Sequence, residues 1–192
     1  MIRIGIVGDI GSGKSHIAKL FGYPVFNADQ EVADLYEKNR RCFVKLKKIF
    51  PKYITSFPIN KRLLVNAIID NDSNLKKITK IIHPEIRLKM NRFIKKNKEK
   101  KIIVLDIPLL IENKLSKKND ILIFVDAKKK EIIKRLKKRP HFNAKIISKL
   151  RRLQLSLEVK KRKSNFVIKN NFKNNVAKKN VKKIKKILLL NV

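Results

Sequence analysis

Apolar residues gather along the chain in five short runs, at residues 2–7, 25–26, 102–105, 121–125 and 166–168. Glycine or polar residues bound these runs, a pattern that predicts short buried β-strands. Helical patterns lie between them: a stretch through residue 21, an amphipathic segment at residues 128–138, and a closing helix at residues 176–190. Because strands alternate with helices, the sequence predicts a layered α/β fold with a mainly parallel sheet.

The segment from about residue 31 to residue 97 contains only helical patterns. We expect breaks in it at Pro51, at Pro58, at residues 71–73 and at His83-Pro84, where a new helix would open. Such a long insert between two strands indicates a helical subdomain carried on the sheet. A further interruption at residues 139–141 precedes a polar helical hairpin that extends to about residue 163.

A phosphate-binding loop follows the first predicted strand. Residues 8–15 fit the pattern G-x-x-x-x-G-K-[ST] at every fixed position, with glycines at Gly8, Gly11 and Gly13. Glycines let the backbone curl so that successive N–H groups point at phosphate oxygens. Lys14 would then reach the β- and γ-phosphates, and the Ser15 hydroxyl would ligate Mg²⁺. A strand before the loop and a helix after it favour nucleotide binding over an incidental glycine-rich turn.

The rest of the chain favours a small-molecule kinase among the proteins that carry this loop. The N-K-x-D motif with which GTPases read the base is not found. The helical insert would hold the acceptor, and a basic segment starting near Arg139 would form a mobile lid over the phosphates. Arg139 is a candidate clamp for the transferred phosphoryl oxygens, and a solvated surface charge is the alternative.

Two carboxylates follow predicted strands on the edge where α/β sheets bind ligands. Asp29 comes shortly after the second strand and would accept the proton of an attacking hydroxyl, or would only cap the helix that follows. Asp106 ends the run at residues 102–105 and is similar to a carboxylate that holds Mg²⁺ directly or through water, or is simply a polar strand end. The residues alone leave both choices open.

Candidates for acceptor binding are fewer and less specific. His83 and Arg87 stand one helical turn apart and would bind an anionic group, although a capping histidine is the commoner arrangement. Pro108 and Leu109 follow Asp106 and would line an acceptor pocket or belong to the core.

Taken in order, these residues resemble the dephospho-CoA kinase family. The resemblance extends over nearly the whole chain, and the combination of His83-Pro84 with D-I-P-L-L-I-E is more specific than the phosphate-binding loop. The segments that carry it are Gly8–Ser15, Asn27–Asp29, His83–Arg87, Leu105–Glu112, Arg135–Arg139 and Val167–Asn171.

The resemblance implies a P-loop NTPase-like three-layer α/β sandwich with a five-stranded, mainly parallel sheet, a helical acceptor-binding insert at about residues 31–97 and a lid at about residues 139–163. It implies transfer of the γ-phosphoryl group of ATP to the ribose 3′-hydroxyl of dephospho-CoA, with Mg²⁺, in the cytoplasm. The implied catalytic residues are Asp29 as base, Lys14 and Arg139. The implied ATP-binding residues are Gly8, Gly11, Ser12, Gly13, Lys14, Ser15 and His16. The implied acceptor-binding residues are Lys61, His83, Arg87, Asp106, Pro108 and Leu109. The implied metal ligand is Ser15, together with Asp106 directly or through water.

Four positions depart from the family pattern, one of them Val7, where many members carry threonine. Asn27 replaces the first aspartate of an Asp-Ala-Asp motif, which removes a charge beside the site but leaves the base. His16 stands where threonine is common, and its backbone would still serve the phosphate cradle. Lys61 stands where arginine is frequent, which would lose a bidentate contact.

Composition changes this picture little. The net charge is +35, from 50 Lys+Arg against 15 Asp+Glu, but the excess is spread along the chain and there is no tryptophan. Enrichment in Lys, Ile and Asn, whose codons are A/T-rich, favours genome composition over a nucleic-acid-binding patch, so we expect no nucleic-acid partner. A single cysteine excludes an internal disulfide, and no apolar run is long enough for a membrane span. Another P-loop kinase, or a basic nucleic-acid-binding P-loop protein, remains as an alternative, and oligomeric state stays open.

Overall fold

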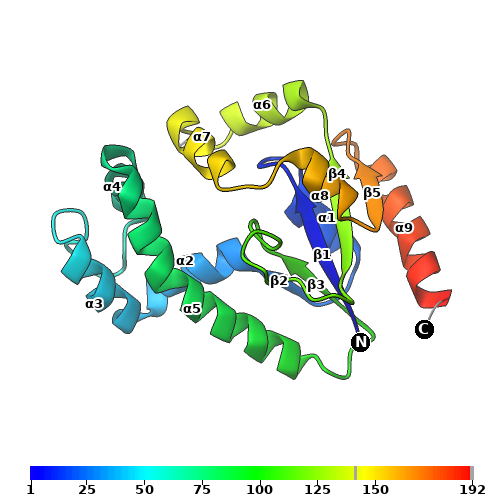
Figure 1. Ribbon diagram of the computed structural model, residues 1–192, viewed down its shortest axis with the longest axis horizontal. Helices are drawn as coiled ribbons and strands as arrows, with labels where there is room; N and C mark the ends of the chain where they lie inside the picture. The colour runs from blue at the N-terminus through cyan, green and yellow to red at the C-terminus, as the bar shows by residue number, and fades with distance from the viewer. Residues whose placement is uncertain (141, 191–192) are drawn as a thin grey trace. The chain divides into compact units, whose positions relative to one another are not determined.

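The computed structural model describes residues 1–140 and 142–190, and it contains one five-stranded sheet (Figure 1). All strands that are neighbours in the sheet run parallel, in the order β2-β3-β1-β4-β5. The strands are β1 (Ile2–Gly8), β2 (Val25–Asn27), β3 (Ile102–Asp106), β4 (Ile121–Asp126) and β5 (Phe166–Lys169). The predicted α/β class, the parallel sheet and its five strands are therefore confirmed.

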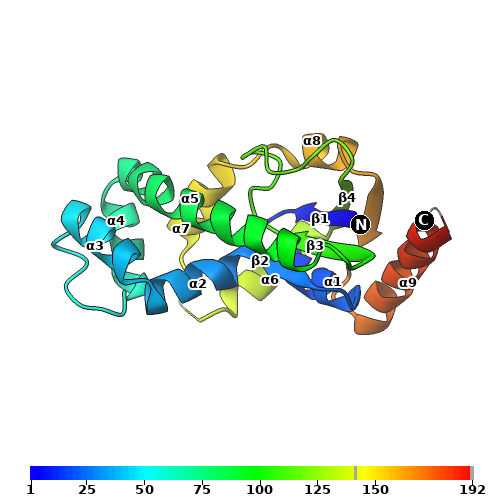
Figure 2. The same cartoon turned by 90° about the horizontal axis from the view of Figure 1, so that it is seen from below.

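The chain divides into two compact units, and the first one contains the sheet. It consists of Met1–Asn27, Asn97–Asn143 and Leu150–Val192. Its helices are α1 (Lys14–Leu20), α6 (Lys129–Lys137), α8 (Leu157–Arg162) and α9 (Asn174–Leu190). Figure 2 shows α8 on one side of the sheet and α1 on the other.

Helices cover the sheet of the first unit because its strands have apolar side chains on both faces. One core cluster joins the sheet to α1 and α9, and it includes Ile4, Ile6, Ile17, Phe21, Ile123, Val181 and Ile184. On the other face the strands leave little room: a Cβ on Gly5 would lie 2.4 Å from Leu110 and 2.8 Å from Leu122. Burial on both faces explains why the strands are continuous apolar runs.

The second unit is helical and consists of Ala28–Lys96 with Ala144–Lys149. Its helices are α2 (Ala28–Lys38), α3 (Arg40–Ile49), α4 (Lys61–Asp70) and α5 (Asp72–Lys96), and the division between the units falls within α7 (Ala144–Arg152). Asparagine side chains cap two of them: Asn39 accepts from Cys42 N at 2.8 Å, and Asn60 from Arg62 N at 2.9 Å. In Figures 1 and 2, α4 lies beside the first part of α5, the long helix against which α2 and α3 also pack.

The break expected at His83-Pro84 is wrong. Pro84 lies inside α5, which continues from Asp72 to Lys96. A proline there cannot donate a backbone hydrogen bond to the carbonyl four residues earlier. However, Ile78, Ile82, Ile86 and Met90 repeat every four residues on both sides of Pro84, and all four are buried. Burial of this continuous apolar face outweighs the local cost of the proline, so His83 lies in the middle of a helix instead of at its start.

The other expected interruptions are present. Asn71 separates α4 from α5, and α6 ends at Lys137, just before the break predicted at residues 139–141. His141, which belongs to this break, lies outside the described residues. Among the helices of residues 1–140 and 142–190, none has the length and apolar character needed to cross a bilayer.

Replacing Pro84 by alanine tests whether packing compensates for a local defect. Pro84 is exposed, so Pro84→Ala buries no less surface, and it restores a backbone donor within α5. We expect the free energy of unfolding to rise by about 1–3 kcal/mol, measured by chemical denaturation. The control is Lys77→Ala at an exposed position of the same helix, where we expect a change within about 0.5 kcal/mol. A loss of stability in Pro84→Ala would show that the proline geometry itself is needed for packing.

Candidate functional site

The loop between β1 and α1 has the backbone of a phosphate cradle. Gly8, Gly11 and Gly13 all have positive φ, at 146°, 86° and 95°. A Cβ at Gly8 would lie 2.7 Å from the carbonyl oxygen of Val125, and one at Gly13 would lie 2.5 Å from Nδ2 of Asn170. Both the left-handed backbone and the close contacts therefore require glycine, which is the geometry that the sequence motif predicts.

Lys14 reaches back over this loop. Its Nζ donates to the carbonyl oxygen of Asp9 at 2.8 Å and to that of Gly8 at 3.4 Å. The amine is thus held beside the curled backbone, where a lysine of this motif serves bound phosphates. Ser12 is fully buried, and its Oγ has no hydrogen-bond partner among the described residues. A buried hydroxyl and a loop that only glycines can form fit a phosphate ligand.

Ser15 and His16 lie in the first turn of α1, and their side chains differ in their contacts. Both are exposed, and Ser15 directly follows Lys14 at the end of the loop. Nε2 of His16 lies 2.9 Å from Oδ1 of Asn174, at the start of α9. The imidazole is therefore engaged with α9, and the backbone of His16 is the part that can serve the loop.

Asn170, directly after the end of β5, holds the loop in place through hydrogen bonds. It follows β5, is 4% exposed, and its Nδ2 donates to the Ser12 carbonyl at 2.8 Å. Its backbone N–H donates to Asp126 O at 2.6 Å, and its Oδ1 accepts from Phe172 N at 3.0 Å. From the sequence, Asn170 stands out only as a member of the family motif at Val167–Asn171. The one feature that could have pointed to its role is its place directly after the last strand.

Asn27 and Asp106 meet at the ends of two paired strands. They are partners in the register of β2 and β3, and Asn27 Nδ2 donates to Asp106 Oδ2 at 2.7 Å. Asp106 is 4% exposed. Asn27 thus does more than remove a charge, because its amide supplies a donor that an aspartate would lack.

Asp29 lies on the exposed surface of the first turn of α2. Since α2 starts at Ala28, Asp29 is inside the helix, and Asn27 is the residue that precedes it. The alternative in which Asp29 stands before the helix as its N-cap is therefore wrong. A carboxylate in a first turn still interacts favourably with the helix dipole.

The other candidates of the second unit are on α4 and α5. Lys61 is the exposed first residue of α4. His83 is half-buried, and burial lowers its pKa, with a further lowering from the Arg87 guanidinium. His83 and Arg87 line a shallow pocket of about 380 Å³ along α5, whose full lining is Lys76, Thr79, Lys80, His83, Pro84 and Arg87. This basic pocket with a neutral histidine suits an anionic ligand.

The segment after β3 is tied to α8 by a buried ion pair. Lys160 is 1% exposed, and its Nζ lies 2.9 Å from Glu112 Oε1 and 3.0 Å from Gln154 Oε1. Pro108 and Leu109, the predicted acceptor-lining residues, are half-buried in the same segment. Arg139, the predicted clamp, is exposed and follows the end of α6.

Comparison with known proteins agrees with the phosphate-binding loop described above, because the matching proteins are kinases. The family model described as dephospho-CoA kinase matches residues 2–176. A dephospho-CoA kinase of Wolbachia sp. subsp. Brugia malayi (strain TRS) is 34% identical over 170 residues, covering 86% of this chain and 87% of the relative. The dephospho-CoA kinase of Bartonella quintana (strain Toulouse) is 35% identical with the same coverage.

Solved structures give the same fold. TT1252 from Thermus thermophilus superposes with a TM-score of 0.79 at 26% identity, over 100% of this chain and 98% of that one. The dephospho-CoA kinase from Campylobacter jejuni gives a TM-score of 0.66 at 21% identity, over 97% and 96%. A shikimate kinase from Acinetobacter baumannii gives 0.53 at 16% identity, over 100% and 94%, which is a likeness of fold alone.

Gly13→Ala tests the steric requirement of the loop, with Gly22→Ala as a matched control. Both glycines have positive φ, but a Cβ on Gly22 has only the flexible Lys185 Nζ nearby, at 3.9 Å. We expect each variant to lose about 1–2 kcal/mol of stability from the left-handed backbone. Only Gly13→Ala should also displace Asn170, with a further loss of about 1 kcal/mol and at least about tenfold weaker ATP binding. Thermal denaturation and calorimetric ATP titration measure the two effects, and equal ATP binding in both variants would contradict the role given to Asn170.

Asn27→Asp tests the amide donor beside Asp106. Two carboxylates at this distance cannot both ionise freely, so the pKa of one is raised in the folded state. The folded protein then holds a proton that the unfolded chain releases above about pH 4. The variant should therefore be close to wild type in stability at about pH 4 and lose about 1–3 kcal/mol by about pH 8. Denaturation curves at both pH values measure this, and a penalty independent of pH would contradict it.

Proposed function

We propose how individual residues act in this chain, which belongs to the dephospho-CoA kinase family and phosphorylates dephospho-CoA in the last step of coenzyme A synthesis. The observation that carries the proposal is the loop at residues 8–15, whose three positive-φ glycines and folded-back Lys14 form a cradle for a triphosphate. The backbone N–H groups of Gly8, Gly11, Ser12, Gly13, Ser15 and His16 bind the ATP phosphates. Lys14 offsets the charge of the transferred group.

Asp29 is the base for the acceptor hydroxyl in this proposal. Its carboxylate is exposed on the first turn of α2, so it has room to receive a proton from the ribose 3′-hydroxyl of dephospho-CoA. Arg139 contributes a guanidinium from the lid at about residues 139–163 and stabilises charge on the γ-phosphoryl oxygens. Positioning and charge stabilisation together lower the barrier, because phosphoryl transfer needs little covalent help from the protein.

The helical insert at about residues 31–97 binds the acceptor. His83 and Arg87 share the pocket along α5, with Arg87 supplying charge and neutral His83 supplying a hydrogen bond to an anionic group of dephospho-CoA. Lys61 adds a second cation at the start of α4. Asp106, Pro108 and Leu109 complete the acceptor side of the site after β3.

A divalent cation accompanies ATP in this family, and we propose Mg²⁺. The Ser15 hydroxyl and the Asp106 carboxylate, the latter through water, are the oxygen donors that a hard cation prefers. Among the described residues there is no cluster of three or more acidic, histidine or cysteine side chains that could hold a metal. This scarcity of donors fits a metal held largely by phosphate oxygens, whose charge it neutralises when bound.

The reaction is tested by coupled ADP release with a panel of acceptors. The panel contains dephospho-CoA, pantetheine, AMP, CMP and shikimate, each at the same concentration with ATP and Mg²⁺. We expect turnover with dephospho-CoA to exceed every other acceptor by at least about 100-fold, because a site built to bind a substrate's polar groups rejects acceptors that lack them. Turnover with another acceptor and none with dephospho-CoA would overturn the proposal.

The role of Asp29 is tested by Asp29→Asn. Asparagine keeps the size of the side chain but cannot accept a proton, and general-base contributions are typically ~10²–10⁴-fold in rate. We expect turnover to fall at least ~100-fold while ATP affinity stays unchanged, and the lost helix-dipole interaction should lower the free energy of unfolding by no more than about 1 kcal/mol. Glu37→Gln, an exposed acid near the end of the same helix, is the control and should turn over like wild type. Wild-type turnover of Asp29→Asn would remove Asp29 from the mechanism.

A further inference from the structure

A carboxylate stands inside the phosphate-binding loop. Asp9 follows Gly8, and its Oδ1 accepts a hydrogen bond from the backbone N–H of Ile10 at 2.6 Å. The Asp9 side chain is only 13% exposed, and its carbonyl oxygen is the one that accepts from Lys14 Nζ. The negative charge of Asp9 is therefore held against the same stretch of backbone that binds phosphates.

Such a charge opposes the function of the loop unless it is cancelled. Two like charges a few ångströms apart repel strongly where water is partly excluded. ATP brings several negative charges to this loop, so an unpaired Asp9 would weaken its binding. In addition, the Asp9 carboxylate already uses one N–H of the loop, that of Ile10.

Arg151, which is far from Asp9 in sequence, neutralises the Asp9 carboxylate. It lies in the last turn of α7, and both residues belong to the sheet-containing unit. Its Nε donates to Asp9 Oδ1 at 3.2 Å, and its Nη2 donates to Asp9 Oδ2 at 2.9 Å. Because this pair is bidentate, it fixes the carboxylate as well as neutralising it.

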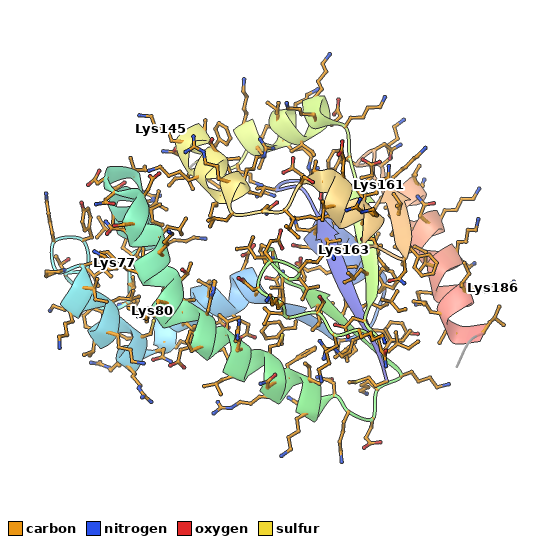
Figure 3. The ribbon with its side chains drawn as sticks, in the orientation of Figure 1. Lys77, Lys80, Lys145, Lys161, Lys163 and Lys186 are labelled. Atoms are coloured by element: carbon orange, nitrogen blue, oxygen red, sulfur yellow. The ribbon has the colours of Figure 1, made fainter. Side chains whose placement is uncertain are left out.

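We propose that Arg151 is a positioning residue for ATP, which acts by neutralising and fixing Asp9 within the phosphate-binding loop. The proposal rests on the function given to this loop above and adds a residue that no motif identifies. The Nε and Nη2 donors of Arg151 both go to Asp9, so its effect on ATP passes through the carboxylate. The lysines labelled in Figure 3 lie on α5, α7, α8 and α9 or directly after α8, but a general positive field does not replace a bidentate partner for one carboxylate.

Two other roles for Arg151 make different predictions. If Arg151 contacts the phosphates itself, its removal weakens ATP binding whether or not residue 9 is charged. If the ion pair serves only stability, removal of either partner has the same effect on ATP. Only the proposed role makes the loss depend on which partner is removed and on the charge that remains.

The test is a double-mutant cycle on ATP affinity, with Asp9→Asn, Arg151→Gln and the double variant in the full chain. ATP dissociation constants are measured by calorimetry without an acceptor, and melting curves are recorded on the same preparations. We expect Arg151→Gln to bind ATP at least about tenfold more weakly than wild type, and Asp9→Asn and the double variant to stay within about threefold. The defect of Arg151→Gln should shrink as salt rises, because salt screens the charge of Asp9 once the arginine no longer covers it.

Arg152→Gln is the matched control. Arg152 is the exposed next residue of α7, and its replacement changes the net charge by the same amount. We expect its ATP affinity to stay within about twofold of wild type, since a distributed surface charge acts weakly at physiological salt.

Two results would overturn the proposal: a double variant as weak as Arg151→Gln, or an Asp9→Asn variant as weak as Arg151→Gln. If Arg151→Gln fails to fold, the double variant against Asp9→Asn still decides, because neither contains the ion pair. A wild-type protein that binds no ATP would overturn the proposed function of the loop instead.

Discussion

The geometry of the site depends on one buried amide, that of Asn170. Its backbone N–H bonds to Asp126 at the end of β4, and its side chain bonds to Ser12 in the loop and to the backbone N–H of Phe172. An Asn side chain can donate and accept at once, so this single residue joins the carboxyl ends of β4 and β5 to the loop that follows β1. The close approach of Asn170 to Gly13 explains why the loop tolerates no side chain there.

How much could be predicted from the sequence depends on the range of the interaction. The central strands β1, β3 and β4 were predictable because strands of a parallel sheet that are buried on both faces are continuous apolar runs, and the edge strands β2 and β5 were predictable as shorter apolar runs. The phosphate loop was predictable because its glycines, Gly8, Gly11 and Gly13, lie close together in sequence and impose their own geometry. The helix break predicted at Pro84 was wrong because helix propensity is a local property and does not reflect the apolar face of α5, which continues on both sides of the proline. The contacts of Arg151 and Asn170 with the loop join residues more than a hundred positions apart, and no spacing rule connects them.

Acidic residues are scarce in this chain, so the positions at which they form ion pairs are informative. With 15 Asp+Glu against 50 Lys+Arg, most cations have no acidic partner and remain solvated. Yet acids occur where a cation is buried: Asp120 pairs with Arg3 at 3.0 Å, and Glu112 with Lys160. A buried cation without a partner costs several kcal/mol, so these positions resist drift towards lysine and asparagine. The large net charge is thus compatible with an ordinary, well-paired interior.

The same reasoning applies to two positions near the phosphate loop, one occupied by an amide and the other by an acid. At residue 27 an amide donates to Asp106, so two carboxylates do not compete at the ends of β2 and β3. At residue 9 a carboxylate is present, and the guanidinium of Arg151 meets both of its oxygens. In each case a nitrogen donor meets the carboxylate, at Oδ2 of Asp106 and at both oxygens of Asp9. A site that must receive a polyanion can contain acidic residues as long as their charge is satisfied locally, whatever the net charge of the whole chain.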